Sequence, residues 1–299
     1  MPKKSDEFTI ITFNLEHDGG PDQENGDFPQ AWHDAHNAMA AHNPDILLRQ
    51  ETTYSRENDC RRLKAAGDAL DMRGFLGQKG SGRNPTGLFI QKSGVVIDVP
   101  AEAFEAPCHH PWRTPPTRAR VHLPEVPETP IDIMSWHFAF TGPVGRSLEI
   151  EQVVGVVDKV KKGHFFIGGG DCNDSALDDS PIHWDTTTDG PHVVHRTLLL
   201  PDGSRVTSNI IDRQLTTAGL VDPARYIGTP AALAPTGGRS KAARGQGGHQ
   251  RIDRIYITQA LATVIEDFTV IDTTGYSDHN AVKLVLSRKG MVEVLKRAA

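Results

Sequence analysis

The chain has 299 residues, of which 37% are hydrophobic and 23% are charged, with 32 basic against 38 acidic side chains and a formal net charge of −6. This composition is typical of a folded globular protein and excludes an intrinsically disordered chain, while the acidic balance argues against nucleic-acid binding through a broad basic surface. No apolar run approaches the roughly 20 residues that span a bilayer, which excludes a membrane-spanning protein.

The first part of the chain alternates patterns typical of strands and helices. The β-branched and aromatic run Phe8–Leu15 predicts a buried strand, and apolar residues at helical spacing between Gln30 and His42 predict a helix. A second strand, Ile46–Leu48, runs into Gln50-Glu51, and a second helix carries apolar residues at positions 63, 66 and 70. This alternation favours an α/β fold.

Further strands dominate the rest of the chain, with one amphipathic helix between residues 150 and 160. Turn residues separate the first four of these strands, which favours antiparallel or mixed pairing. The predicted strands are Gly87–Ile90, Val95–Val99, Arg118–Leu123, Ile131–Trp136, Phe165–Gly168, Ile252–Ile257 and Ala281–Leu286. We interpret residues 1–299 as one domain, with a mobile surface loop at residues 231–249, where Gly, Ala and Arg occur without a period.

The cysteines and the N-terminal residues indicate a compartment. No apolar stretch follows Lys3 and Lys4, so a secretory signal peptide is not indicated. Cys60, Cys108 and Cys172 are odd in number and widely spaced, so they form neither a disulfide framework nor a CxxC metal site. We therefore predict a cytoplasmic protein without a membrane partner, and we expect a monomer.

Polar side chains lie where the predicted strands end. Because ligands of α/β sheets bind in the crevice at the strand ends, we expect these side chains to surround one pocket. Their carboxylate and amide oxygens are the ligands that Mg²⁺ prefers, with Mn²⁺ as a substitute, whereas zinc sites use several His or Cys residues. The segments are Asn14-Leu15-Glu16, Gln50-Glu51, Ser135-Trp136-His137, Gly170-Asp171-Cys172-Asn173, Ile252-Asp253-Arg254 and Ser277-Asp278-His279.

These six segments resemble, in content and in order, the motifs of the endonuclease/exonuclease/phosphatase superfamily, the deoxyribonuclease I-like fold. TFNLE resembles its first motif, LLRQE its metal-binding Glu motif, SWHF its catalytic His motif, GGDCN its GDxN motif, RIDRI its RIDxI motif and YSDHNAV its terminal SDH motif. The resemblance spans Thr12 to Val282. It implies a four-layer α/β/β/α sandwich of two mixed sheets flanked by helices, with a divalent-metal-dependent phosphoesterase site.

The resemblance also implies a metal-binding role for four residues. Glu51 would be a principal ligand, with Asn14 and Asp278 close to the metal. Glu16 departs from the short polar residue that many nuclease members carry two positions after the first-motif Asn, and its longer side chain either approaches the metal or faces solvent. Asn14 taken alone could also be an ordinary turn residue.

Five further residues would act on the phosphate, as the resemblance implies. Asp171 would orient or deprotonate the attacking water, and Asn173 would hold a phosphoryl oxygen through its amide. His279 would contact the scissile phosphate, oriented by Asp253 in a carboxylate–imidazole pair that favours the imidazolium. His137 would stabilise the developing negative charge or help to protonate the leaving oxygen.

Several neighbouring residues have competing interpretations. Arg118 and Arg120 alternate on one predicted strand face, where they either bind a substrate phosphate or form a solvated surface. The three consecutive glycines before Asp171 precede no GK[ST] sequence, so they predict close backbone approach rather than a P-loop. Cys172 is expected to be a small buried residue rather than a nucleophile. The pairs His109-His110 and His192 with His195 are expected in loops, without a shared ligand face.

Three functions stay open at this point. Hydrolysis of phosphodiester bonds in nucleic acid or nucleotides is favoured, because nuclease members resemble this motif set most closely. A phosphatase or phosphodiesterase acting on a small phosphorylated metabolite suits the acidic net charge. A non-catalytic binding protein is disfavoured, because Glu51, Asp171, Asn173, Asp253, Asp278 and His279 are all present. The sequence shows no clear match to the tyrosine that abasic-site nucleases place near the leaving group, which disfavours that particular activity.

Overall fold

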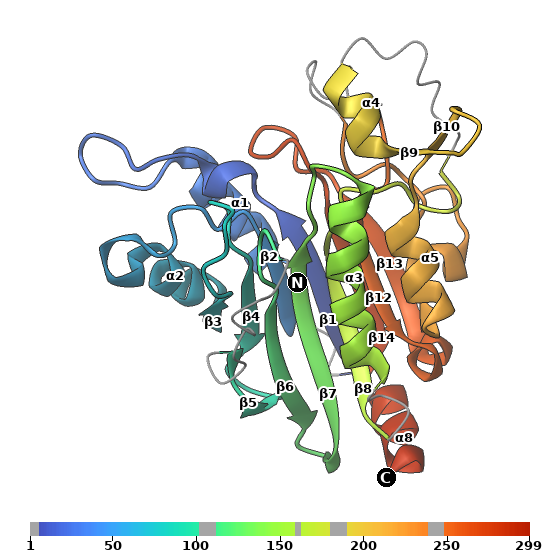
Figure 1. Cartoon of the computed structure of the whole chain (residues 1–299). Helices are drawn as coiled ribbons and strands as arrows, with labels where there is room; N and C mark the ends of the chain where they lie inside the picture. The colour runs from blue at the N-terminus through green and yellow to red at the C-terminus, as the bar shows by residue number, and fades with distance from the viewer. Residues whose placement is uncertain (1–5, 102–111, 159–162, 180–189, 239–247) are drawn as a thin grey trace.

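The structure is a computed structural model that describes residues 6–101, 112–158, 163–179, 190–238 and 248–299. Two six-stranded sheets pack face to face at its centre, with helices on both outer sides (Figure 1). This arrangement is the four-layer sandwich of two mixed sheets that the sequence motifs imply. None of the helices within the described residues combines the length and the apolarity that a membrane crossing requires.

The first sheet joins the N-terminal half of the chain to its C-terminal strands. Strands β1 and β2 are parallel, and all other neighbours in the sheet are antiparallel. Its strand order is β13 (Ile265–Ile271), β14 (Ala281–Ser287), β1 (Glu7–Asn14), β2 (Ile46–Gln50), β4 (Gly87–Gln91) and β3 (Met72–Leu76). The chain therefore returns at its end to pair with its first strand.

The second sheet also has six strands, of which one neighbouring pair is parallel. Strands β7 and β8 are parallel, and their other neighbours are antiparallel. Its order is β11 (Leu220–Val221), β12 (Asp253–Thr258), β8 (Phe165–Asp171), β7 (Val126–His137), β6 (Thr117–Leu123) and β5 (Val96–Val99). A separate two-stranded sheet joins β9 (Thr197–Leu199) to β10 (Arg205–Thr207), next to helix α4 (Gly190–Arg196).

Three hydrophobic clusters hold the layers together, because the central strands are apolar on both faces. In β1, Phe8 and Ile10 lie in the cluster between the two sheets, whereas Ile11 and Phe13 lie under the helices of the first sheet. This alternation explains why the strand is an unbroken apolar run. Each fully buried side chain of this size contributes about 1.5–3 kcal/mol to stability.

Helices cover the outer faces of both sheets and one end of the sandwich. Helices α1 (Gln30–Ala40) and α2 (Glu57–Leu70) cover the first sheet, while α3 (Pro143–Val157) and α5 (Ile210–Thr217) cover the second (Figure 1). Helix α8 (Arg288–Ala298) places Met291 and Leu295 in the cluster between the sheets. The remaining short elements are the 3-10 turns η1 (Glu16–Gly19) and η5 (Gln259–Val264) and helix α6 (Pro223–Ile227).

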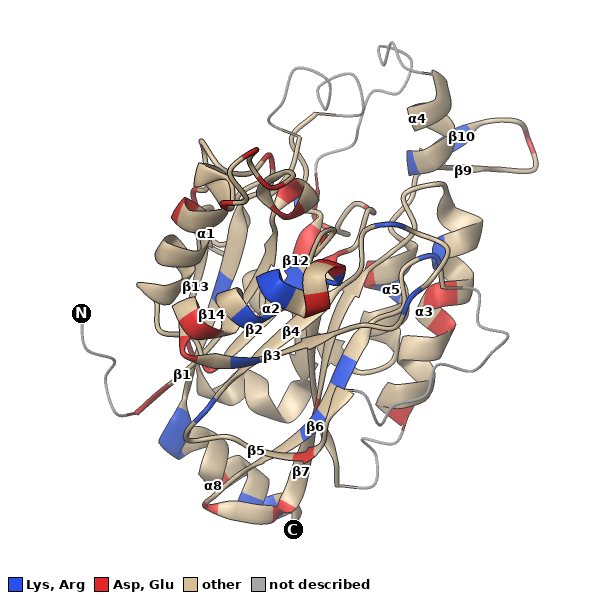
Figure 2. Cartoon of the chain, turned by 90° about the vertical axis from the view of Figure 1, so that its left-hand side faces the viewer, with Lys and Arg blue, Asp and Glu red and all other residues tan. Residues whose placement is uncertain are grey.

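Charged side chains of both signs are mixed on the side that carries α1 and α2 (Figure 2). The side view shows acidic and basic segments in alternation rather than one continuous basic face.

Two expectations from the sequence need correction in the described part of the chain. Within the predicted mobile loop at residues 231–249, Ala232 lies in the cluster between the sheets and Thr236 is buried, so residues 231–238 are packed; residues 239–247 lie outside the described residues. His192 and His195 lie in helix α4 rather than in a loop. The pair His109-His110 lies outside the described residues.

Candidate active site

The polar residues of the six motifs converge because of the sheet topology. In the parallel pairs β1/β2 and β7/β8, the C-terminal ends lie at the same edge, and these ends carry Asn14, Glu51, His137 and Asp171. Strands β12 and β14 run antiparallel to their neighbours, so the beginnings of these strands, with Asp253 and His279, reach that same edge. Side chains of both sheets thus surround a cavity of about 300 Å³.

The Asp171 carboxylate is fixed on both oxygens. Its Oδ1 accepts the backbone N–H of Asn173 at 2.7 Å, and its Oδ2 accepts the Asn14 amide at 3.2 Å. The Nε2 atoms of His137 and His279 lie 3.6 Å and 3.9 Å from Oδ2. Burial alone would raise the pKa of Asp171, but His279, His137 and a nearby arginine together outweigh burial and lower the pKa. The group is therefore held as a carboxylate.

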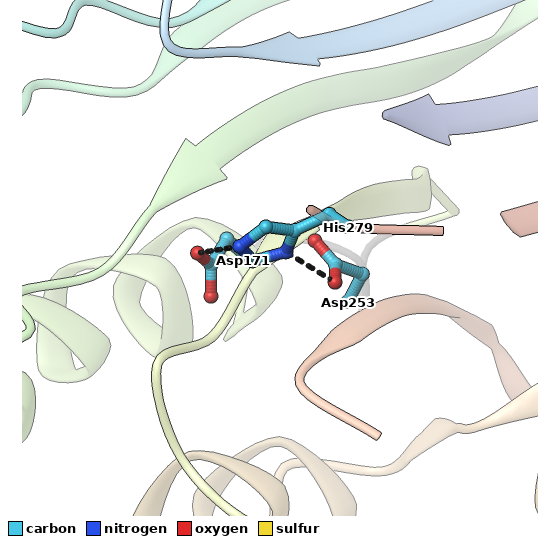
Figure 3. A group of neighbouring side chains, drawn as sticks. All are labelled: Asp171, Asp253 and His279. Carbon is cyan, nitrogen blue, oxygen red and sulfur yellow. Dashed lines mark hydrogen bonds and ion pairs between the residues drawn. The ribbon is translucent and has the colours of Figure 1, made fainter. Parts of the chain in front are cut away.

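His279 is oriented by a buried carboxylate. Its Nδ1 lies 2.8 Å from Oδ2 of Asp253, and its Nε2 points toward Asp171, as Figure 3 shows. Asp253 is in turn held by its own backbone N–H, which donates to the Thr236 hydroxyl at 2.8 Å. Burial would lower the pKa of His279, but Asp253 outweighs burial and raises the pKa well above its ordinary value. The pair therefore holds an imidazolium that can donate from Nε2 into the cavity.

Glu51 stands directly after β2 and is held by three neighbours. Its Oε1 lies 3.4 Å from the Asn14 amide nitrogen, and its Oε2 accepts the backbone N–H of His17 at 2.9 Å and the Asn84 amide at 3.1 Å. The backbone of Glu51 has a positive φ of 57°. Such a conformation costs about 1–3 kcal/mol in a residue with a side chain, and it persists where the surroundings enforce it, commonly at functional sites.

Glu16 and Asp278 complete an acidic group around Glu51. Burial, followed by the charges of Asp278 and Glu51, raises the pKa of Glu16. Within the described residues, two oxygens of this region, Asn14 Oδ1 and Asp278 Oδ1, are buried without a hydrogen-bond partner. Repelling carboxylates and unsatisfied oxygens are both stabilised by a cation, so the hard oxygen donors present here fit a divalent metal such as magnesium.

A second possible metal-binding group consists of Asp171, Asp253 and His279, whose ligand atoms all lie within 4.8 Å of one another. Its central contact, from His279 Nδ1 to Asp253 Oδ2, already satisfies both atoms with a hydrogen bond. A metal held by these three side chains would have to replace that bond. We therefore interpret Asp253 and His279 as a hydrogen-bonded pair that faces Asp171, and the oxygens near Glu51 as the set that better fits a metal.

Asn173 is positioned by its own backbone and by two contacts. Its φ is 48°, its amide nitrogen donates to the Phe138 carbonyl at 3.0 Å, and its Oδ1 accepts Arg196 Nη2 at 3.3 Å. Just before it, Gly170 has a φ of 150°, and a Cβ at this position would collide with the Trp136 carbonyl oxygen. This close approach of β7 to β8 is what the sequence prediction expected of the glycine run.

Hydrogen bonds between buried polar groups of the first sheet and Ser135 of the second sheet join the two sheets near the cavity. Gln50 accepts from the Thr12 hydroxyl at 3.3 Å and donates to Ser135 Oγ at 3.1 Å, and Ser135 donates to the Arg49 carbonyl at 3.0 Å.

Cys172, next to Asp171, is fully buried, and burial raises the pKa of its thiol to about 12. This value excludes a thiolate nucleophile at neutral pH, in agreement with the sequence prediction.

Arg118 and Arg120 are not part of the cavity lining. Both guanidinium groups bind the buried carboxylate of Asp132, at 2.8 Å and 3.2 Å, on the neighbouring strand β7. Their spacing does place them on one strand face, but that face neutralises a buried charge. The structure therefore gives no support to the predicted substrate-binding role of these two residues.

Several residues that the sequence did not single out line the cavity instead. Three are arginines, at positions 83, 113 and 196, and two others, His17 and Asn84, hold Glu51. His17 sits in the turn η1, which is anchored where Arg49 binds Asp18 at 3.3 Å. The Asp–Arg pair is buried, so the turn that carries His17 is fixed to β2. No local sequence pattern marks these residues, because they meet only in the folded chain.

Comparison with known proteins places this arrangement in a family. Similar solved structures include an AP endonuclease from Archaeoglobus fulgidus, with 17% identity, a TM-score of 0.62 and coverage of 93% of this chain and 99% of that chain. They also include TDP2 from D. rerio complexed with a single-strand DNA product, with 15% identity, a TM-score of 0.58 and coverage of 93% and 98%. A third is the 3′ phosphatase NExo from Neisseria bound to a product DNA hairpin, with 17% identity, a TM-score of 0.59 and coverage of 94% and 99%.

At these identities the structural likeness shows the fold. No curated protein sequence matches the chain. The sequence model of the Endonuclease/Exonuclease/phosphatase family, however, matches residues 11–279. This range contains the first five motifs, the sixth as far as His279, and most of the chain. The protein is thus a hydrolase that acts on phosphoester bonds, and it belongs to the Endonuclease/Exonuclease/phosphatase family.

Proposed function

We propose that the protein is a divalent-metal-dependent phosphodiesterase that hydrolyses nucleic acid or nucleotides by in-line attack of water. The observation that carries this proposal is the carboxylate of Asp171, which is fixed on both oxygens and faces two imidazoles at one end of the cavity. Glu51 and Asp278 line the same cavity. Nucleophile-orienting and charge-stabilising groups thus face one another across a space that admits a phosphate ester.

In this proposal Asp171 orients the attacking water. Its lowered pKa keeps it ionised, so Oδ2 accepts a hydrogen bond from water and receives the proton as the new P–O bond forms. Asn14 and the backbone of Asn173 fix the carboxylate, so little reorganisation accompanies the attack. Positioning of this kind supplies much of the rate enhancement in phosphoryl transfer.

Three other residues act on the phosphate. His279 donates from Nε2 to a non-bridging oxygen, with Asp253 stabilising the imidazolium, and Asn173 donates its amide to a second oxygen. His137 lies on the other side of Asp171 and stabilises the negative charge on the oxygen that leaves as the second P–O bond breaks, or supplies its proton. Donors placed where charge develops are worth about 3–4 kcal/mol each in well-studied hydrolases.

Glu51, Asn14 and Asp278 would hold the metal, with Glu16 at its side. The support is the pair of buried oxygens, Asn14 Oδ1 and Asp278 Oδ1, that accept no hydrogen bond from any residue the structure describes, and the raised pKa of Glu16 beside two other carboxylates. When bound, Mg²⁺, or Mn²⁺ in its place, would polarise the phosphoryl group as a Lewis acid.

The substrate class is argued from charge and from the relatives. Three arginines line the cavity despite the net charge of −6, which favours an anionic substrate. Two of the similar structures hold DNA products, and this favours nucleic acid for the present chain. A small phosphorylated metabolite is the alternative, because a cavity of about 300 Å³ also accommodates a compact phosphate ester. Monomeric state and cytoplasmic location stay predictions from the sequence.

The test is a panel of DNA, RNA, nucleotides and sugar phosphates, incubated with Mg²⁺, with Mn²⁺ or with EDTA. Metal-dependent release of nucleotides from polymers by the wild type, and none by D171A, is the expected result. Circular dichroism of D171A verifies that the variant is folded. Release from small molecules alone would replace the nuclease proposal with the phosphatase alternative.

A further inference from the structure

Helix α4 and the hairpin β9–β10 stand apart from the two central sheets. They extend beyond the end of the second sheet, above α3 and α5 (Figure 1). None of the six sequence motifs lies in this segment, which separates Asn173 from α5. Its helix ends at Arg196, and Arg196 is the residue of the segment that lines the catalytic cavity.

The backbone around Arg196 is held from two sides. Arg146 of helix α3 donates from Nη2 to the His195 carbonyl at 2.8 Å, and the N–H of Ser208 donates to the Arg196 carbonyl at 2.8 Å. Arg146 is fully buried and pairs with Asp174 at 3.3 Å. The position of Arg196 is therefore set by a buried ion pair, which is a more rigid support than an exposed loop provides.

The guanidinium of Arg196 makes one contact that bears on catalysis. Its Nη2 donates to Asn173 Oδ1 at 3.3 Å, while the Asn173 amide nitrogen donates to the Phe138 carbonyl at 3.0 Å. Since guanidinium can only donate, this contact determines which end of the Asn173 amide is oxygen and which is NH₂. Arg196 thus fixes the orientation in which Asn173 can donate to a phosphoryl oxygen.

A second nitrogen of the same group is left without a partner. Arg196 Nη1 is buried, and no residue in the described part of the chain accepts a hydrogen bond from it. An unsatisfied donor of a charged group is costly. Because Arg196 lines the cavity, a phosphate oxygen bound there would give this donor a partner. The cavity also holds the carboxylates of Glu51, Asp171 and Asp278, which repel a phosphate. A fixed cation offsets that repulsion.

We propose that Arg196 binds a non-bridging oxygen of the substrate phosphate through Nη1 while it positions Asn173 through Nη2. This inference rests on the proposed function, because it assigns a further residue to the same phosphate. Arginine suits this role because its planar fork makes two directed hydrogen bonds at once, which a lysine ammonium does not reproduce in the same geometry.

The test compares R196A and R196K with R205A, which removes an arginine from strand β10 of the same hairpin, where Arg205 binds the Thr197 hydroxyl. The readouts are the dissociation constant of inorganic phosphate, measured by calorimetry, and kcat and KM for the best substrate of the panel. We expect R196A to weaken phosphate binding and to lower kcat, each on the order of 10- to 100-fold. Added guanidinium ion should restore part of the R196A rate, and R205A should behave as the wild type.

The R196K variant distinguishes the contact with phosphate from the contact with Asn173. It also tests the inference if R196A does not fold. R196K should retain part of the phosphate affinity through its charge but lose kcat, because one ammonium does not also orient Asn173. Wild-type phosphate affinity and wild-type kcat in R196K, or unchanged phosphate affinity in a folded R196A, would overturn the inference.

The measurement of phosphate binding requires no turnover. It therefore distinguishes a failure of the proposed function from a failure of the inference about Arg196. A protein that binds phosphate through Arg196 but hydrolyses no ester would contradict only the proposed function. An active enzyme whose phosphate affinity does not depend on Arg196 would contradict only this inference.

Discussion

Replacing Asp253 by Asn tests how the buried carboxylate controls His279. The substitution keeps the size of the side chain but removes the charge that lies 2.8 Å from His279 Nδ1. A hydrogen bond between charged groups contributes about 1.5–3 kcal/mol. If that energy supports the imidazolium in the transition state, kcat of D253N should fall on the order of 10- to 150-fold at neutral pH.

The activities of the wild type and of D253N should depend differently on pH. In the wild type, Asp253 raises the pKa of His279 well above its ordinary value, so the imidazolium persists as the pH rises. In D253N the largest charge that opposes the burial of the ring is removed and only the charges of Asp171 and Asp278 still oppose it, so the pKa of His279 falls back toward its ordinary value. The activity of D253N should therefore decline as the pH increases from about 6 to 8, where wild-type activity is retained, and it should recover partly below about pH 6.

The assay is steady-state hydrolysis of the best substrate of the panel over this pH range, with thermal unfolding as a measure of the fold. D98N is a matched control, because Asp98 pairs with His122 at 2.6 Å away from the cavity lining. It should leave kcat unchanged. A D253N enzyme with wild-type kcat and an unchanged pH profile would refute the role given to the Asp253–His279 pair.

Three further predictions concern the metal, the acid stability and the thiol. E51Q should raise the Mg²⁺ concentration for half-maximal rate on the order of 10- to 100-fold, and an unchanged titration would remove Glu51 from the ligand set. Burial would raise the pKa of Asp212, but hydrogen bonds from Arg225 and from the Leu177 backbone outweigh it and hold that pKa well below its usual range. Asp212 thus contributes stability above about pH 4 that is lost on acidification. The free energy of unfolding, measured by urea titration, should therefore fall more steeply below about pH 4 in the wild type than in D212N. Equal slopes in the two proteins would contradict this prediction. With serine at the other two cysteine positions, the thiol of Cys172 should react with a thiol reagent only after denaturation, because burial raises its pKa to about 12, and rapid reaction of the native protein would show the site to be open.

Most of the fold, and many of the residues that meet at the cavity, could be predicted because the sequence signals are local. A strand such as β1 is apolar on both faces and ends abruptly in a polar residue, so both the strand and the side chain at its end are readable. Strands β3 and β13 were missed, because they lie at the edges of the first sheet and carry exposed polar residues such as Arg73 and Glu266. Helices α5 and α8 were missed as well.

The sequence does not predict the roles of the arginines correctly, because their charge partners come from distant segments of the chain. The sequence leaves Arg118 and Arg120 open between phosphate binding and a solvated face, because their own strand does not show what they face. The partner is Asp132 on the neighbouring strand β7, a buried carboxylate that requires a cation to pair with. Arg196 was missed for the converse reason, because only the packing of α4 near Asn173 brings it into the cavity.

The central claim, metal-assisted attack by a water that Asp171 orients, is tested most directly by a single-turnover assay on an end-labelled oligonucleotide. Wild-type protein and D171N are each measured with Mg²⁺ and with EDTA. The account predicts cleavage by the wild type with Mg²⁺ alone and a rate lower by a factor on the order of 10² to 10⁴ in folded D171N. Cleavage that persists in EDTA, or a D171N rate equal to that of the wild type, would contradict it.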